Sequence, residues 1–292
     1  MKQVTVVGLG LIGSSLGLAL KQLKPPPLVV GHDNQYDAAV RAQKLKAVDR
    51  VERNPLEAVS GSDLVVVATP VGTIASVLET VAPALQAGCV VTDTGSTKLE
   101  ILRRAQELLP REVAFVGGHP MTGQATAGVD RPDASLFQGA IYCVAPAVTA
   151  PPSAVSTVVS MIQAIGAQPY FVDPAEHDGL VAGISHLPYL LSATLMRVLA
   201  SEPSWREMSV LAAGGFDTAT RLAGQNPKMY SDILSDNAGN VVRHLDRLME
   251  ELQAVRGRLL NGEPGILKEL EEAQHRRAAW EEQRRRDAAD RA

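Results

Sequence analysis

The chain of 292 residues is long enough for two domains, each with a substantial core. Its formal net charge is −4 and no segment is strongly basic, which argues against nucleic acid as a partner. The two cysteines and the absence of a His/Cys cluster at ligand spacing argue against a metal site. Apolar runs such as residues 64–68 are too short to cross a bilayer, and the first three residues lead directly into a strand-like run. We therefore expect a soluble, cytoplasmic protein with no membrane partner.

A glycine-rich motif follows the first strand-like run, and an apolar helical pattern follows the motif. This strand–turn–helix context is typical of the dinucleotide-binding sequence Gly-x-Gly-x-x-Gly. The first glycine permits a tight turn, the second lets the backbone approach a pyrophosphate, and the third lets the helix pack against the strand. Unpaired N–H groups at the start of the helix favour phosphate there. The expected cofactor-binding residues are Gly8, Gly10, Leu11, Ile12 and Gly13.

Asp33 follows the second strand-like run and lies twenty residues beyond Gly13. A carboxylate at this place accepts hydrogen bonds from both ribose hydroxyls and repels a 2′-phosphate, so it predicts NAD rather than NADP as the cofactor. The alternative is that Asp33 only caps the helix expected to start near Asn34.

Strand-like and helical patterns alternate up to residue 173. The unbroken apolar run at 64–68 is typical of a parallel strand covered on both faces, and it stops at Thr69-Pro70. Further strands are expected at 28–31, 48–51, 90–92, 113–116, 141–145 and 169–172, with helices at 35–46, 54–60, 73–85, 99–109 and 154–165. The alternation predicts an α/β fold, a Rossmann-type, doubly wound, mostly parallel sheet over residues 1–173. Ligands of such sheets bind beyond the carboxyl ends of the strands.

The pattern changes after residue 174, where only helices are expected. Pro188 lies inside the helical pattern of 175–199 and predicts a kink beside His186. A long helix is expected over 237–260, and the charged segment from 264 contains the i,i+4 pairs Glu272–Arg276 and Glu281–Arg285. An all-helical domain over 174–292 must cover its apolar stripes, and a second copy is the usual cover. We therefore predict a homodimer.

Three polar clusters stand at the ends of predicted strands. They are Thr69-Pro70, which we expect beside the cofactor, Ser96 with Lys98, and His119. His119 is the best candidate for a general base, because an imidazole has an unperturbed pKa near 6.5 and its position aims it at the cofactor cleft. The alternative is that His119 only hydrogen-bonds a turn at Gly117-Gly118.

Other candidates each have a second interpretation. Ser96 either orients His119 or caps the helix expected from Thr97. His186 either reaches a substrate or lies buried between helices. Arg221 either binds a carboxylate through its fork of N–H donors or is a surface arginine. The remaining histidines suit structural or surface roles, although His177 lies beside Asp178 at a helix start; they are His32, His177, His244 and His275.

Several separated motifs together resemble the prephenate/arogenate dehydrogenase family, in the right order over about residues 2–285. They are the segment from Gly117 to Gly123, Ile184-Ser185-His186-Leu187-Pro188, the turn from Ser96 to Lys98, Gly215-Phe216 with Thr220-Arg221, and Asn226-Pro227. The resemblance implies a Rossmann-type domain followed by a helical dimerisation domain. It also implies NAD-dependent oxidative decarboxylation of prephenate to 4-hydroxyphenylpyruvate, a step toward tyrosine.

The resemblance assigns roles to the candidates. His119 would take the proton of the ring C4 hydroxyl and Ser96 would orient both groups. His186 and Arg221 would hold the substrate, and Gln124 joins them as a substrate-binding candidate. Many relatives carry an acidic residue where this chain has Ala125, and that residue can meet the amino group of arogenate. Its replacement favours prephenate and leaves arogenate open.

Two other functions fit a Rossmann domain followed by helices. A β-hydroxyacid dehydrogenase-like reductase usually employs a catalytic lysine in the second domain, but no lysine occurs between Lys98 and Lys228. A non-catalytic NAD-binding protein would not need His119, Ser96, His186 and Arg221 together.

Overall fold

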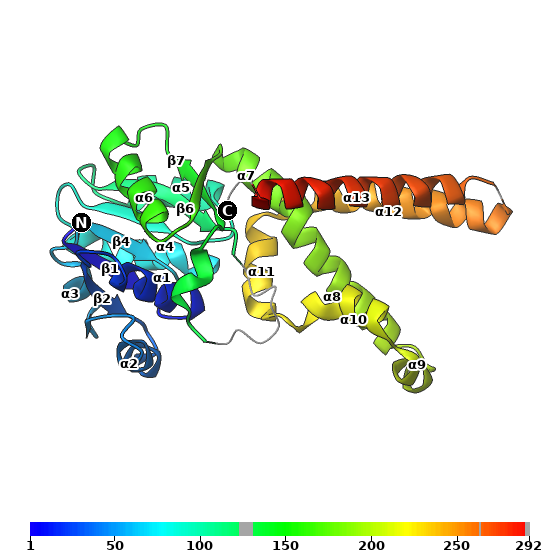
Figure 1. Ribbon diagram of the computed structural model, residues 1–292, viewed down its shortest axis with the longest axis horizontal. Helices are drawn as coiled ribbons and strands as arrows, with labels where there is room; N and C mark the ends of the chain where they lie inside the picture. The colour runs from blue at the N-terminus through cyan, green and yellow to red at the C-terminus, as the bar shows by residue number, and fades with distance from the viewer. Residues whose placement is uncertain (123–130, 263, 290–292) are drawn as a thin grey trace. The chain divides into compact units, whose positions relative to one another are not determined.

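The computed structural model describes residues 1–122, 131–262 and 264–289 (Figure 1). The chain divides into two compact units, residues 1–240 and residues 241–292. The first unit contains an eight-stranded sheet and the helices that follow it up to residue 240. The predicted domain boundary after residue 173 stays a prediction, since the sheet and the helices of 174–240 belong to one unit.

The sheet has the strand order β3-β2-β1-β4-β5-β6-β7-β8. All neighbouring strands run parallel except β6 and β7. The chain order reverses between β1 and β4, which is where doubly wound sheets open a crevice at the carboxyl ends of their strands. The predicted fold class is therefore confirmed. The strands are β1 (Gln3–Val7), β2 (Leu28–His32), β3 (Arg50–Val51), β4 (Leu64–Val67), β5 (Val90–Asp93), β6 (Ala114–Pro120), β7 (Ile141–Pro146) and β8 (Gln168–Phe171).

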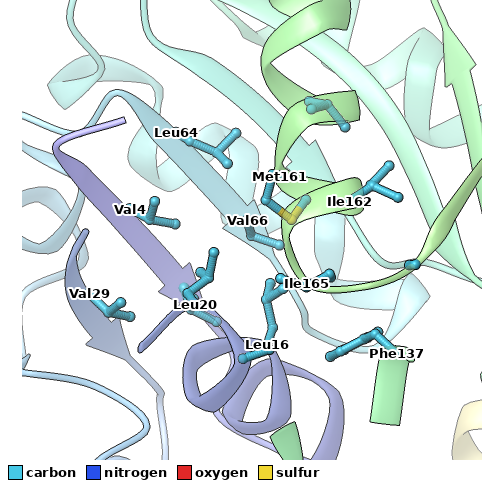
Figure 2. Packing of buried hydrophobic residues seen from close by; sticks show 14 of the residues in the cluster. Val4, Leu16, Leu20, Val29, Leu64, Val66, Phe137, Met161, Ile162 and Ile165 are labelled. Carbon is cyan, nitrogen blue, oxygen red and sulfur yellow. The ribbon is translucent and has the colours of Figure 1, made fainter. Parts of the chain in front are cut away.

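Helices cover both faces of the sheet because successive strand residues point to opposite sides. Figure 2 shows one of the two cores, where Val4 and Val66 of the strands pack with Leu16 and Leu20 of α1 and with Met161 of α6. The second core lies on the opposite face, where the intervening strand residues pack with α4 and α5. The helices of this part are α1 (Leu11–Lys21), α2 (Tyr36–Lys44), α3 (Pro55–Val59), α4 (Val71–Val81), α5 (Leu99–Leu108) and α6 (Pro152–Ala164).

Strand β6 is longer than the sequence pattern indicates and continues to Pro120. Antiparallel pairing with β7 extends it and sets His119 opposite Cys143. Gly117 and Gly118 therefore lie in the strand and not in a turn, which corrects the prediction. Their role is to permit close packing, since a Cβ on Gly118 would lie 2.6 Å from the carbonyl oxygen of Asp93.

The helices of residues 174–240 begin with an uninterrupted helical stretch. It consists of α7 (Pro174–Val181), a π-helical turn (Ala182–His186) and α8 (Leu187–Ala200). The π-helical turn ends two residues before Pro188 and contains His186, beside which the sequence predicts a kink. Next come α9 (Trp205–Leu211), α10 (Gly214–Thr220), a 3₁₀ turn (Arg221–Gly224) and α11 (Pro227–Asp236).

The helical stretch over residues 174–200 is long and apolar, which matters for the expectation that the protein has no membrane partner. It is the one helix in the described part of the chain that is long and apolar enough to span a bilayer by length and composition, with a hydropathy of 1.3 in its most apolar window. Core helices of soluble proteins satisfy the same criterion, so the observation is weak evidence for a membrane span.

The second unit, residues 241–292, contains most of α12 (Ala238–Asn261) and all of α13 (Ile266–Ala289). Arg258 of α12 pairs with Glu269 of α13 at 2.8 Å. The predicted pair Glu272–Arg276 is present at 2.5 Å. Glu281 pairs with Arg277 and not with Arg285, which is a correction to the second predicted pair.

Candidate active site

The glycine turn after β1 shows why three glycines are needed. Gly8 has a φ of +95°, and a Cβ there would lie 2.6 Å from the carbonyl oxygen of Ala68. A Cβ on Gly13 would lie only 1.9 Å from the carbonyl oxygen of Gly8, so α1 approaches the turn too closely for any side chain. A Cβ on Gly10 would meet nothing within 4 Å. The start of α1, at Leu11 and Ile12, therefore faces open space beside Gly10, as a phosphate site requires.

Asp33 ties the end of β2 to this turn. Its Oδ2 accepts a hydrogen bond of 2.7 Å from the N–H of Leu9, and its Oδ1 accepts one of 2.8 Å from the N–H of Gln35. The second bond resembles the cap considered in the sequence, although Gln35 and not Asp33 is the N-cap residue of α2. Each carboxylate oxygen keeps a further lone pair, so the same group has acceptors left for ribose hydroxyls.

Thr69 and Pro70 follow β4, the neighbour of β1 in the sheet. Pro70 is the N-cap residue of α4, and the Thr69 methyl group lies 2.9 Å from where a Cβ of Gly8 would be. The hydroxyl oxygen of Thr69 is buried and has no hydrogen-bond partner among the described residues. A buried hydroxyl without a partner is unfavourable, so it marks a place where a ligand can complete the bonding.

The turn between β5 and α5 carries Ser96 and Lys98. Helix α5 begins at Leu99, and the carboxylate of Asp178 caps it by accepting from the N–H groups of Lys98 (2.8 Å) and Leu99 (3.0 Å). The interpretation of Ser96 as the helix cap is therefore wrong. Its proposed catalytic role stays a prediction.

Lys98 is completely buried beside the candidate base. Its ammonium pairs with Asp93 and donates a hydrogen bond of 2.7 Å to the carbonyl oxygen of Gly118, the residue before His119. Burial lowers the pKa of Lys98, and the Asp93 carboxylate opposes this effect. Lys98 thus fixes the end of β6 against β5.

His119 lies half-buried near the carboxyl end of β6. Its Nδ1 is 2.9 Å from Nε2 of His177, and the two rings meet edge to face. Burial lowers the pKa of His119 well below 6.5, and the unfavourable interaction of a protonated His119 with His177, Lys98 and His186 adds to this effect. The imidazole is therefore neutral at pH 7, which is the form that a general base needs.

His177 and Asp178 are functional candidates that sequence reasoning missed. Both side chains are buried at the start of α7, and Nδ1 of His177 lies 2.8 Å from Oδ1 of Asp178. The adjacent pair at a helix start was a visible signal, but no spacing pattern connects it with His119, which lies 58 residues earlier.

His186 is buried in the π-helical turn. Its Nδ1 lies 3.2 Å from Nδ2 of Asn237, which also donates a hydrogen bond of 2.7 Å to the main-chain carbonyl of Asp178. Burial lowers the pKa of His186 to about 4, although the Asp178 carboxylate acts in the opposite direction. Nε2 of His186 is buried and has no partner in the part of the chain that the structure describes. The structure thus gathers His119, His177 and His186 around Asp178.

Arg221 lies at the start of the 3₁₀ turn after α10. It is exposed, and none of the carboxylates within the described ranges pairs with its guanidinium. Burial raises the pKa of Tyr230, and the nearby Arg221 opposes this shift. Tyr230 stacks on Tyr189 of α8 with ring centroids 3.5 Å apart. Among the described residues, no hydrogen bond links the Arg221 guanidinium to the histidines, and Gln124 lies outside these residues.

The arrangement defines a class of protein before any comparison. A nucleotide-type glycine turn and a neutral imidazole occupy the same edge of a doubly wound sheet, which is the arrangement of a nucleotide-dependent dehydrogenase. Within the residues described, no group of three or more His, Cys, Asp or Glu side chains is arranged so that it could hold a metal ion. This arrangement is common to several dehydrogenase families.

Comparison with known proteins identifies the family. The family model described as prephenate dehydrogenase, nucleotide-binding domain, matches residues 16–171, and the model described as prephenate dehydrogenase, dimerization domain, matches residues 173–271. The chain belongs to the prephenate dehydrogenase family. The predicted family, enzyme class and nucleotide-binding domain are therefore confirmed.

Three relatives illustrate the range of the family. Prephenate dehydrogenase of Bacillus subtilis is 33% identical over 87% of this chain and 69% of its own. Cyclohexadienyl dehydrogenase of Zymomonas mobilis is 30% identical over 95% of this chain and 96% of its own. The crystal structure of Synechocystis arogenate dehydrogenase is 28% identical and superposes with a TM-score of 0.80 over 95% of this chain and 99% of that one. These relatives differ in the substrate that their names give.

Proposed function

We propose that this protein catalyses the NAD-dependent oxidative decarboxylation of prephenate to 4-hydroxyphenylpyruvate. The observation that carries the proposal is the neutral His119 at the carboxyl edge of the sheet, in a chain that belongs to the prephenate dehydrogenase family. The prephenate dehydrogenase of B. subtilis supports this choice of substrate.

The cofactor site is built from backbone and from one carboxylate. The open space at Gly10, the bare start of α1 and the unpartnered hydroxyl of Thr69 fit a dinucleotide, with Gly8, Gly13, Leu11, Ile12 and Pro70 shaping the same turn. Asp33 favours NAD over NADP because a 2′-phosphate beside its carboxylate would be repelled. When bound, NAD supplies the acceptor for the hydride that leaves the substrate.

His119 acts as the general base. It accepts the proton of the ring C4 hydroxyl while hydride leaves the same carbon, so no full positive charge builds up on the substrate. Ser96, in the turn after β5, orients that hydroxyl and the imidazole. Loss of the ring carboxylate as CO₂ makes the ring aromatic, which draws the reaction toward product.

The substrate is held by cations and donors from the helices after residue 174. His186 presents its buried, unpartnered Nε2, and Arg221 presents a guanidinium without a carboxylate partner among the described residues. An arginine fork binds a carboxylate with two parallel hydrogen bonds. Gln124 stays a substrate-binding candidate on sequence grounds alone.

Arogenate is the second candidate substrate. This choice is supported by the relatives named arogenate dehydrogenase and cyclohexadienyl dehydrogenase, which are 28% and 30% identical to this chain. Arogenate carries an ammonium group where prephenate has a keto group. The position that many relatives fill with an acidic residue is Ala125 here, which favours prephenate.

One assay distinguishes these functions. NADH formation is followed by absorbance with prephenate, with arogenate and with a panel of 3-hydroxy acids, each with NAD and with NADP. We expect turnover with prephenate and NAD. With NADP, kcat/KM should be at least about tenfold lower, which corresponds to a free-energy difference of about 1.4 kcal/mol between the two cofactors. Turnover only with 3-hydroxy acids, or with none of the compounds, would contradict the proposal.

The proposed assembly is a homodimer formed through residues 174–292, and the proposed location is the cytoplasm. The family model named for dimerization covers 173–271, and apolar side chains on one side of the stretch 174–200 are exposed in the single chain. They are Leu180, Ile184, Leu191, Leu195 and Val198. Light scattering coupled to size-exclusion chromatography should give twice the mass of 31.0 kDa, and a monomer would contradict this assembly.

A further inference from the structure

The active-site histidines are joined to one buried residue by a continuous hydrogen-bond chain. One branch leads from the Asp178 carboxylate through His177 to His119, and the other leads from the Asp178 main-chain carbonyl through Asn237 to His186. Because each neutral imidazole carries its proton on only one of two nitrogens, the partner at one nitrogen decides what the other can do.

The first branch starts from a group that accepts hydrogen bonds. The Asp178 carboxylate accepts from the N–H groups of Lys98 and Leu99, so its oxygens act as acceptors at the end of α5. Nδ1 of His177, 2.8 Å from Oδ1, must therefore be the donor. In a neutral His177 this leaves Nε2 as an acceptor, and Nδ1 of His119 at 2.9 Å must then carry the hydrogen. Nε2 of His119 is left with a free lone pair.

In the second branch, Nδ1 of the histidine accepts a hydrogen bond, whereas in the first branch Nδ1 of His119 donates one. Asn237 must turn its NH₂ group toward the carbonyl oxygen of Asp178, since two oxygens would repel each other, and its own Oδ1 accepts from Asn240 at 2.8 Å. The second N–H of the same NH₂ group faces Nδ1 of His186 at 3.2 Å. Nδ1 is therefore an acceptor, and the hydrogen of His186 lies on its buried, unpartnered Nε2.

We propose that Asp178 is a positioning residue that holds the two active-site histidines in opposite tautomers. Through His177 it keeps Nε2 of His119 free to accept a proton, and through Asn237 it keeps Nε2 of His186 as a donor to the substrate. The roles of the two histidines rest on the proposed function. The tautomers themselves rest on the hydrogen-bond partners, with the tautomer of His119 set by a neutral His177.

The same chain serves the proton transfer itself. When Nε2 of His119 takes a proton, the ring becomes cationic while Nδ1–H still donates to His177. His177 donates in turn to the Asp178 carboxylate, so the new positive charge lies two hydrogen bonds from a fixed negative one. His177, Lys98 and His186 are the other groups near His119 that can carry positive charge, and Asp178 is the carboxylate that the hydrogen-bond chain sets against the charge on His119.

The first experiment reads the tautomers directly. Long-range ¹H–¹⁵N NMR of protein labelled with ¹⁵N-histidine, with and without NAD, distinguishes protonated from bare ring nitrogens, and His119→Asn and His186→Asn variants assign the signals. We expect the hydrogen of His119 on Nδ1 and that of His186 on Nε2. A hydrogen on Nε2 of His119 or on Nδ1 of His186 would overturn the inference. Because no substrate is used, failure of the wild type to turn over prephenate would count against the proposed function alone.

The second experiment separates positioning from a structural role with two variants that differ by one methylene. The amide of His177→Gln reaches the place of Nε2 and can still accept from His119, whereas the amide of His177→Asn reaches only the place of Nδ1 and can still bond to Asp178. If His177 positions His119, the Asn variant loses kcat by about 10²-fold or more and the Gln variant stays within about tenfold of wild type. The Kd for NAD should not change in either variant.

If His177 only packs beside Asp178, the Asn variant is the more active of the two, and that result would overturn the inference. The exposed His275→Gln on α13 serves as the matched control and should leave kcat, KM and the other histidine signals unchanged. Should both variants at residue 177 fail to fold, the wild-type NMR spectrum still decides.

Discussion

The two halves of the candidate site recognise their ligands in different ways. The cofactor half, around Gly8, Gly10 and Gly13, works through backbone N–H groups and through empty space, and only Asp33 adds a charge. The catalytic half works through the half-buried His119 and the buried His186, whose protonation is set by neighbours. The first half therefore depends on shape, and the second half depends on proton placement.

Because of this difference, the two halves are sensitive to different changes. A backbone site is damaged by any added side chain but is indifferent to pH, because its donors do not titrate. A site built from imidazoles fails when a proton lies on the wrong nitrogen, even where the shape of the site is unchanged. Substitutions in the two halves should therefore change different kinetic constants.

The largest effect is expected from removing the base. In His119→Asn, kcat/KM for prephenate should fall by about 10²–10⁴-fold, or about 3–5 kcal/mol of barrier, since a positioned base contributes that much. Steady-state NADH absorbance measures the change. The Kd for NAD, from fluorescence titration, and the Tm should stay close to wild type. A weakened Kd with unchanged kcat would place residue 119 in the cofactor half instead.

Arg221→Ala should have the next largest effect, and it should act on binding. Losing a charged hydrogen bond worth about 1.5–3 kcal/mol should raise KM for prephenate by about ten- to 150-fold. Arg221→Lys should recover part of the lost affinity for prephenate, because lysine keeps the positive charge but not the two parallel N–H donors of the guanidinium. If KM for prephenate is unchanged in Arg221→Ala, Arg221 is a surface arginine.

A pair of glycine substitutions tests the cofactor half. Gly10→Ala adds a methyl group where the protein leaves open space, so the Tm without NAD should be unchanged while the Kd for NAD rises at least about tenfold. Gly13→Ala adds the same group 1.9 Å from the Gly8 carbonyl oxygen, so it should lower the free energy of unfolding by about 1–3 kcal/mol as well.

Thermal melts and NAD titrations of the two glycine variants give both quantities. Equal NAD affinity in wild type and Gly10→Ala would contradict the phosphate site at the start of α1. Equal Tm values for the two variants would contradict the packing distances that distinguish the glycines.

The same contrast explains what the sequence could predict. A glycine turn is local, so its three glycines and Asp33 could be found from spacing over about thirty residues. His119 could be found because it ends a strand of a parallel sheet. His177, Asp178 and Asn237 could not be connected to it, because the contacts join β6, α7 and the end of α11 across 58 to 59 residues of sequence.

Two misreadings have physical causes as well. Ser96 resembled a helix cap because serine fills that role well. The cap is instead the carboxylate of Asp178, which lies 79 and 80 residues beyond Leu99 and Lys98, whose N–H groups it accepts from. Gly117-Gly118 resembled a turn, because the antiparallel partner β7 that keeps these residues extended is not visible in the local pattern. Tertiary contacts overruled local preference in both cases.

The smallest expected effect concerns pH and tests the catalytic half without any substitution. An imidazole with the ordinary pKa near 6.5 would be half protonated at pH 6.5, and kcat/KM would be halved there. Burial and the nearby His177, Lys98 and His186 lower the pKa of His119. Its base form therefore persists below pH 6.5, and kcat/KM should change by less than about twofold between pH 8 and 6.5.

The value of kcat/KM should fall tenfold per pH unit only once the pH passes below the lowered pKa of His119. Initial rates at low prephenate concentration and saturating NAD give the profile, with the NAD Kd measured at each pH as the control. A kcat/KM that falls through a pKa of 6.5 or higher would show that the base is exposed to water, and it would place the proton acceptor outside the buried chain that ends at Asp178.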